Sequence, residues 1–175
     1  MTASRLLAVS AIGADRPGIV AAVTGALAEV GGNLEDTSMT ILRGHFAMTL
    51  VVACDRSAEE VEQALASAAG ELNLLVSVRE VPVGVETGAP GEHHVLTLHG
   101  ADRPWIVARV SGLVADLGGN VTDLVTRLAG PLYVLTMELD LPRGVDTEAV
   151  SAQLGELARD LGVEASLRPA DADLL

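Results

Sequence analysis

One short segment combines residue types and spacing that suit the binding of a small zwitterion. It reads Asp15, Arg16, Pro17, Gly18, Ile19, Val20. Arg16 precedes a proline and is therefore biased away from helical backbone, so Pro17 is predicted as the first helical residue. The next backbone N–H groups, at Gly18, Ile19 and Val20, then have no partner within the helix. They lie at the positive end of the helix dipole and form a site for a carboxylate.

Three side-chain features of this region complete the predicted chemistry. Gly18 has no side chain, so a ligand can approach the backbone closely. Asp15 can accept hydrogen bonds from an ammonium group, and Asn33 offers one acceptor and two donors. These groups predict a site for both ends of an amino acid. A purely structural interpretation stays open, in which Asp15 stabilises the helix start and Asn33 pairs with turn backbone.

The same segment occurs twice at a constant offset. Residues 13–17 return as residues 100–104, and Gly-Gly-Asn at 31–33 returns at 118–120. The match needs no gap between positions 13 and 52. Agreement of this length indicates a duplicated domain.

The second copy therefore carries a second candidate site. Asp102, Ile106 and Asn120 stand at the positions of the first site's Asp, Ile and Asn. One position differs, because Trp105 replaces Gly18. We expect the indole to narrow or fill the second pocket, which favours the first loop as the better ligand site.

Each copy shows the periodicities of a β-α-β-β-α-β unit. Apolar residues alternate in the predicted strands and recur at helical spacing in the predicted helices, and a capping box starts at Ser57. The elements predicted in the first copy are 6–12, 17–30, 34–42, 45–53, 57–69 and 72–81. Those predicted in the second copy are 95–98, 104–117, 121–128, 132–141, 147–161 and 163–167.

This element order predicts an α+β fold made of two tandem ferredoxin-like sandwiches. In such a unit a four-stranded antiparallel sheet carries both helices on one face. We expect a first domain at 1–81, a second domain at 93–170 and a tail at 171–175. The Gly- and Pro-containing segment 82–92 has the composition of a linker. We expect the two units to pack against each other.

Composition narrows the classes of partner. The formal net charge is −13 and all eleven basic residues are scattered arginines, so direct nucleic-acid binding is not expected. No stretch has the length of a membrane span, so no membrane partner is expected. The single Cys54 fits a reducing compartment and a buried or edge thiol. We expect a cytoplasmic protein.

No motif predicts catalysis, a metal or a cofactor. His93 and His94 are adjacent in a predicted strand, so they point to opposite faces and cannot chelate one ion together. No Cys or carboxylate cluster has metal-ligand spacing, and no nucleophile stands beside a base. We therefore predict that the chain is not an enzyme.

The segment Asp15–Val20 together with Gly31-Gly32-Asn33 resembles the motif of ACT domains. A tandem pair without a catalytic domain is similar to the glycine cleavage system transcriptional repressor group. The resemblance implies sites that lie between two ACT copies. One would combine the Asp15–Val20 loop with Asn120, and the other the 102–107 loop with Asn33.

Two functions remain open at this point. In the first, an amino acid binds between the ACT domains and changes the surface that a protein partner contacts, which would control transcription or amino-acid metabolism. In the second, the ACT folds form a non-sensing interaction module or the regulatory subunit of a metabolic enzyme. Exposed sheet edges make a homodimer possible under either function.

Overall fold

The computed structural model describes residues 5–84 and 91–170. The chain divides into two compact units, Met1–Val85 and Glu86–Leu175. The first unit contains β1 (Arg5–Ala14), α1 (Ile19–Glu29), β2 (Asn33–Leu42), β3 (His45–Cys54), α2 (Ala58–Leu72) and β4 (Leu74–Val81). The second contains β5 (Glu92–Ala101), α3 (Ile106–Asp116), β6 (Asn120–Ala129), β7 (Leu132–Leu141), α4 (Thr147–Leu161) and β8 (Val163–Pro169).

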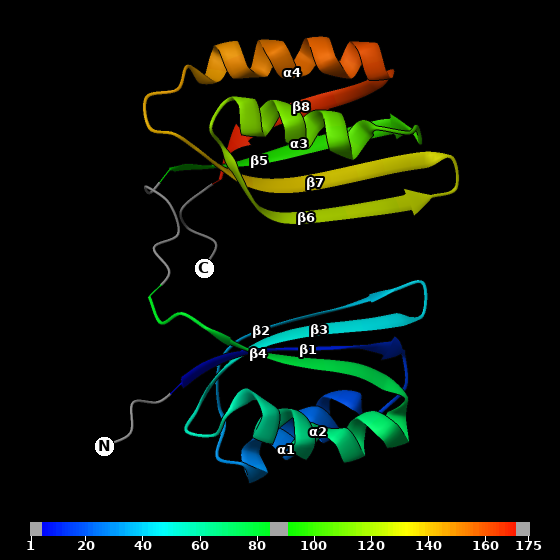
Figure 1. Cartoon of the computed structure of the whole chain (residues 1–175). Helices are drawn as coiled ribbons and strands as arrows, with labels where there is room; N and C mark the ends of the chain where they lie inside the picture. Colours follow the sequence, from blue (N-terminus) through cyan, green and yellow to red (C-terminus); the bar gives the residue numbers. More distant parts are fainter. Residues whose placement is uncertain (1–4, 85–90, 171–175) are drawn as a thin grey trace. The chain divides into compact units, whose positions relative to one another are not determined.

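Each unit has the predicted α+β sandwich. The strands form an antiparallel sheet in the order β2-β3-β1-β4 in the first unit and β6-β7-β5-β8 in the second. Within each unit both helices lie on the same face of the sheet (Figure 1). The prediction of two tandem β-α-β-β-α-β units is confirmed. The strands β2 and β6 are sheet edges, and almost all of their residues are exposed.

The core of the first unit forms where alternating strand residues meet the apolar stripe of α1. Leu7 and Val9 on β1 and Ile19, Val23 and Leu27 on α1 are fully or almost fully buried. Alternation places every second strand residue on the helix face, and the spacing of the α1 residues places them on one side of that helix. Cys54 belongs to this core and is buried, as predicted.

The first helix ends as predicted but starts two residues later than predicted. Gly31 has φ +78, its N–H donates to Ala28 O at 3.0 Å, and the Gly32 N–H donates to Leu27 O at 2.9 Å. This pair of hydrogen bonds is a Schellman motif. At the other end Pro17 precedes the helix, because Gly18 has φ +94 and is the N-cap. The assignment of Pro17 as the first helical residue is therefore wrong, and α3 likewise begins at Ile106 rather than residue 104.

The second helix is longer than predicted. Its predicted capping box is present: the Glu60 N–H donates to the Ser57 hydroxyl at 3.3 Å, and the Ser57 N–H donates to the Glu60 carboxylate at 2.8 Å. The helix continues to Leu72, and Asn73 with φ +53 ends it. Leu72, predicted to begin the last strand, is therefore helical. That strand begins at Leu74.

The described residues include only part of the predicted linker and none of the predicted tail. Strand β5 begins at Glu92, the last residue of the predicted linker. Of the linker, residues 85–90 lie outside the described residues, and so does the predicted tail 171–175. No helix in the described ranges is long and apolar enough to cross a membrane.

Candidate functional site

The loop between β1 and α1 holds the predicted binding residues in a fixed backbone. The Asp15 N–H donates to Gly44 O in the β2–β3 turn at 2.8 Å, and the first α1 hydrogen bond runs from Ala22 N–H to Gly18 O at 2.9 Å. The N–H groups of the three residues before Ala22 therefore have no partner four residues back. They form the positive end of an eleven-residue helix.

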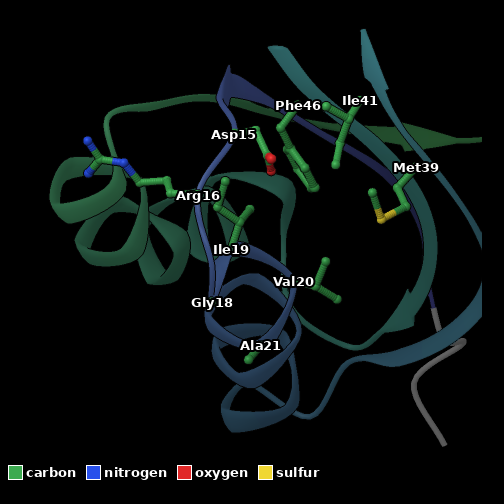
Figure 2. A pocket seen from close by; sticks show the side chains of 9 residues that line it. All are labelled: Asp15, Arg16, Gly18, Ile19, Val20, Ala21, Met39, Ile41 and Phe46. Atoms are coloured by element: carbon green, nitrogen blue, oxygen red, sulfur yellow. The ribbon is translucent and has the colours of Figure 1, made fainter. Parts of the chain in front are cut away.

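This loop borders a cavity of about 520 Å³ between α1 and the edge strand β2. We call it the α1 cavity. Figure 2 shows the side chains of Asp15, Val20, Met39, Ile41 and Phe46 gathered around it. The residues that line it are Asp15, Arg16, Gly18, Ile19, Val20, Ala21, Met39, Ile41 and Phe46. The cavity thus has a carboxylate and free backbone N–H groups on one side and apolar side chains on the other.

The predicted loop residues differ in whether their side chains reach the α1 cavity. Asp15 and Val20 present exposed side chains at the cavity. Ile19 contributes its backbone, because its side chain is 1% exposed and belongs to the core. The Arg16 side chain extends away from the cluster formed by Asp15 and Phe46 (Figure 2). Pro17 is not among the lining residues.

Asn33 does not join Asp15 within the unit. It starts β2, opposite Ala53, whereas the Asp15 loop lies at the other end of that strand, beside Gly44. At roughly 3.3 Å per residue, the strand carries Ile41 about 26 Å from Asn33. The prediction that Asn33 and the loop of its own copy hold one ligand together is therefore wrong. Asn120 starts β6 in the same way.

Sequence reasoning missed the cavity's apolar side. Met39 and Ile41 lie two residues apart on β2 and share the helix face of the sheet with Phe46, which pairs with Ile41. The missed signal was the alternation within 37–41, where Thr37, Met39 and Ile41 face the helix layer. Met39 and Ile41 are each 45% exposed.

The corresponding region of the second unit has different chemistry. Thr126 and Tyr133 stand where the first unit has Met39 and Phe46. Burial raises the pKa of Tyr133, a hydrogen bond with Thr126 lowers it, and the nearby charge of Asp102 raises it.

Trp105 does not fill a pocket of its own unit. Its side chain is 74% exposed, and its backbone has φ +76 at the N-cap of α3. The indole therefore fills no space within the second unit, and its effect on a pocket shared with the other copy stays a prediction.

The histidines of β5 have protein partners. His93 Nδ1 lies 2.8 Å from an Asp140 carboxylate oxygen, and its Nε2 lies 3.5 Å from Glu138. The hydrogen bond with Asp140 raises the pKa of His93, and Glu138 adds to the shift. His94 is buried on the other face and contacts Glu92 O at 2.8 Å. Among the residues described here, no group of three or more His, Cys, Asp or Glu is placed to hold a metal ion.

The two β-α-β-β-α-β units match the ACT domain model at residues 5–79 and 92–168. The chain therefore belongs to the ACT domain family.

Known relatives narrow the class further. A UPF0237 protein of Methanopyrus kandleri is 44% identical over 78 residues, which are 43% of this chain and 87% of that protein. The glycine cleavage system transcriptional repressor of Escherichia coli K12 is 27% identical over 128 residues, 73% of this chain and 67% of the repressor. The crystal structure of an unknown protein from Galdieria sulphuraria superposes with a TM-score of 0.81 at 26% identity, covering 95% of this chain and 99% of that chain.

These relatives confirm the resemblance to ACT proteins and to the glycine cleavage repressor. Among these relatives, the glycine cleavage system transcriptional repressor is a regulatory protein by name. The present chain is accordingly an ACT-domain protein that is similar to a transcriptional regulator, as predicted.

Proposed function

We propose that this regulatory protein senses a free amino acid at the α1 cavity and passes that state to a protein partner. One observation supports the proposal most directly: the Asp15 carboxylate and the free N–H groups at the start of α1 lie at the same cavity. The N–H groups attract the ligand carboxylate. Asp15 attracts the ammonium group.

The partner is a protein rather than a nucleic acid. A net charge of −13 opposes binding to a phosphate backbone. A role in transcription or amino-acid metabolism would therefore act through a cytoplasmic protein whose contact surface depends on the bound ligand. Similarity to a transcriptional repressor supports this type of role.

A titration of the full chain with the twenty amino acids tests the proposal. A ligand at about a hundred times its Kd stabilises the native state by roughly 2.7 kcal/mol, which is a rise of several degrees in Tm. Asp15→Ala and Gly18→Trp should abolish the shift. Asp102→Ala is the matched control in the second unit and should leave most of it. A panel without any shift would contradict the proposal.

The contributions of Asn33 and Asn120 remain predictions from the resemblance. If Asn120 completes the site of the Asp15 loop, Asn120→Ala weakens binding while Asn33→Ala leaves that site unchanged. The reverse pattern, or no effect of either variant, would remove Asn120 from the site.

A second candidate is a non-sensing interaction module. It is favoured by the edge strand β2, which is exposed along its whole length and presents Leu34, Met39, Ile41 and Leu42. An unpaired edge with apolar side chains is a template for another chain. This function predicts no ligand response and a stable homodimer or partner complex in sedimentation experiments.

A further inference from the structure

The apolar side of the α1 cavity is not covered by the unit that forms it. Val20 is 41% exposed, and Met39 and Ile41 are each 45% exposed. Together they face the space beside the Asp15 loop (Figure 2). Phe46 also lines the cavity, but it is 2% exposed and belongs to the core.

The polar groups that would bind a zwitterion lie on one side of the cavity, and the exposed apolar side chains lie on the other. Asp15 and the N–H groups of residues 19–21 belong to the loop and the first turn of α1, whereas Met39 and Ile41 belong to β2. The side chain of an amino acid bound at the loop would lie either against the exposed apolar side chains of the cavity or in solvent. Contact with these side chains removes apolar surface of both partners from water and is therefore favoured.

We infer, on the basis of the proposed function, that the ligand is an amino acid with an apolar side chain of valine size or larger. The side chain packs on Val20, Met39 and Ile41, which we call the apolar wall. Glycine makes the same polar contacts but leaves the wall exposed. Specificity at this site thus comes from β2 and α1, whereas the loop recognises the backbone groups common to all amino acids.

The duplicated unit shows how the chain itself alters this wall. Thr126 replaces Met39, and Tyr133 replaces Phe46, so that two hydroxyl-bearing residues stand at these positions of the second unit. An apolar side chain placed there would leave these hydroxyl groups with fewer partners, which costs binding free energy. Val107 and Leu128 keep the other two positions apolar, so the apolar selectivity of the second unit should be weaker than that of the first.

Calorimetric titration of the full chain with glycine, alanine, leucine and methionine tests the inference. We expect leucine or methionine to bind at least about tenfold more tightly than glycine, the effect of a partly buried aliphatic side chain. Met39→Thr introduces the residue that the second unit already carries and should reduce leucine affinity by about tenfold. It should leave glycine affinity unchanged.

Leu42→Thr is the matched control for Met39→Thr. Leu42 is exposed on the same strand but pairs with His45 on the opposite face of the sheet, outside the α1 cavity. Its substitution should change neither affinity. Ile41→Thr is a second wall variant and should act like Met39→Thr, with circular dichroism to verify that each variant is folded.

The outcomes separate the inference from the proposed function. If glycine binds as tightly as leucine, the apolar wall is not used and the inference fails, while amino-acid sensing stands. If leucine is preferred but Met39→Thr and Ile41→Thr bind it normally, the assignment of the wall is overturned. If none of the four amino acids binds and the full panel is also silent, both ideas fail.

Discussion

Gly18 and Trp105 occupy the same position of the repeat and share a left-handed backbone, with φ +94 and +76. Glycine adopts this conformation without cost, whereas a residue with a β-carbon is strained in it. The backbone of the first unit has thus been kept in the second, although the side chain no longer suits it. The two copies of the loop therefore share a backbone conformation but differ in side-chain chemistry.

The faces of the two sheets that carry no helix differ in the same way. His93, Glu138 and Asp140 form an ionic cluster in the second unit. The corresponding residues of the first unit are Leu6, Val51 and Ala53, which are apolar. The duplication therefore produced one unit with apolar residues at these three positions and one unit with an ionic cluster there. We expect the two units to respond differently to ligand, substitution and pH.

The largest effect should come from the aromatic pair Phe46 and Tyr133. Phe46 is 2% exposed in the core, so Phe46→Ala should lower the free energy of unfolding of the first unit by about 3–5 kcal/mol. Tyr133 is only half-buried, and Tyr133→Ala should cost less. Hydrogen exchange of strand amides should show which unit is affected. Equal loss of protection in β1 and β5 for Phe46→Ala would mean that the units unfold together.

Exchange of the residues at the helix start should have opposite effects in the two units. Gly18→Trp should destabilise the chain by about 1–2 kcal/mol through backbone strain alone, because a β-carbon at Gly18 meets no atom within 4 Å. Trp105→Gly relieves the corresponding strain and should raise Tm. The measurement is thermal unfolding without ligand. A Tm lowered by Trp105→Gly would show that the indole makes stabilising contacts that outweigh the strain.

The two long helices begin with different caps, and each cap should have a similar effect. Ser57 forms a capping box with Glu60, whereas the Asp146 carboxylate accepts from the N–H groups of Glu148 and Ala149 at 3.0 and 3.2 Å. Ser57→Ala and Asp146→Ala should each cost about 1 kcal/mol in denaturant unfolding. A loss confined to one variant would show that the caps are not equivalent.

The smallest effect concerns pH. The hydrogen bond with Asp140 raises the pKa of His93 above its ordinary value of 6.5, so folding favours the protonated imidazole. This contribution is complete below the unfolded pKa and is lost as pH rises through the folded pKa. Tm should therefore fall slightly between about pH 6 and about pH 8. His93→Gln should flatten this dependence. Leu6, the residue at this position in the first unit, has no proton to exchange. An unchanged profile in His93→Gln would assign the dependence to other groups.

The fold was predictable because its determinants are local and occur twice. The alternation in the strands, the glycine pair after α1 and the capping box at Ser57 each indicate an element without reference to the rest of the chain. The start of α1 was misplaced because proline and glycine both suit a helix start. Only the backbone shows that Gly18 is left-handed.

Only the part of the candidate site that comes from a single loop could be predicted from the sequence. Asp15 and the free N–H groups come from one loop and can be recognised from their order in the sequence. Met39, Ile41 and Phe46 reach the α1 cavity through strand order and register. Asn33 was grouped with the loop because both are polar, but the length of β2 separates them. Long-range placement of this kind depends on sheet topology, which composition does not determine.

The single cysteine and the single tryptophan fall in different units. Cys54 is buried in the core of the first unit, and Trp105 is exposed at the helix start of the second. A thiol reagent can therefore reach its target only when the first unit opens, and its rate of reaction reports that opening. Indole fluorescence reports on the environment of the second unit. The natural chain thus carries two separate spectroscopic and chemical reporters, one for each half of the duplication, without any engineered label.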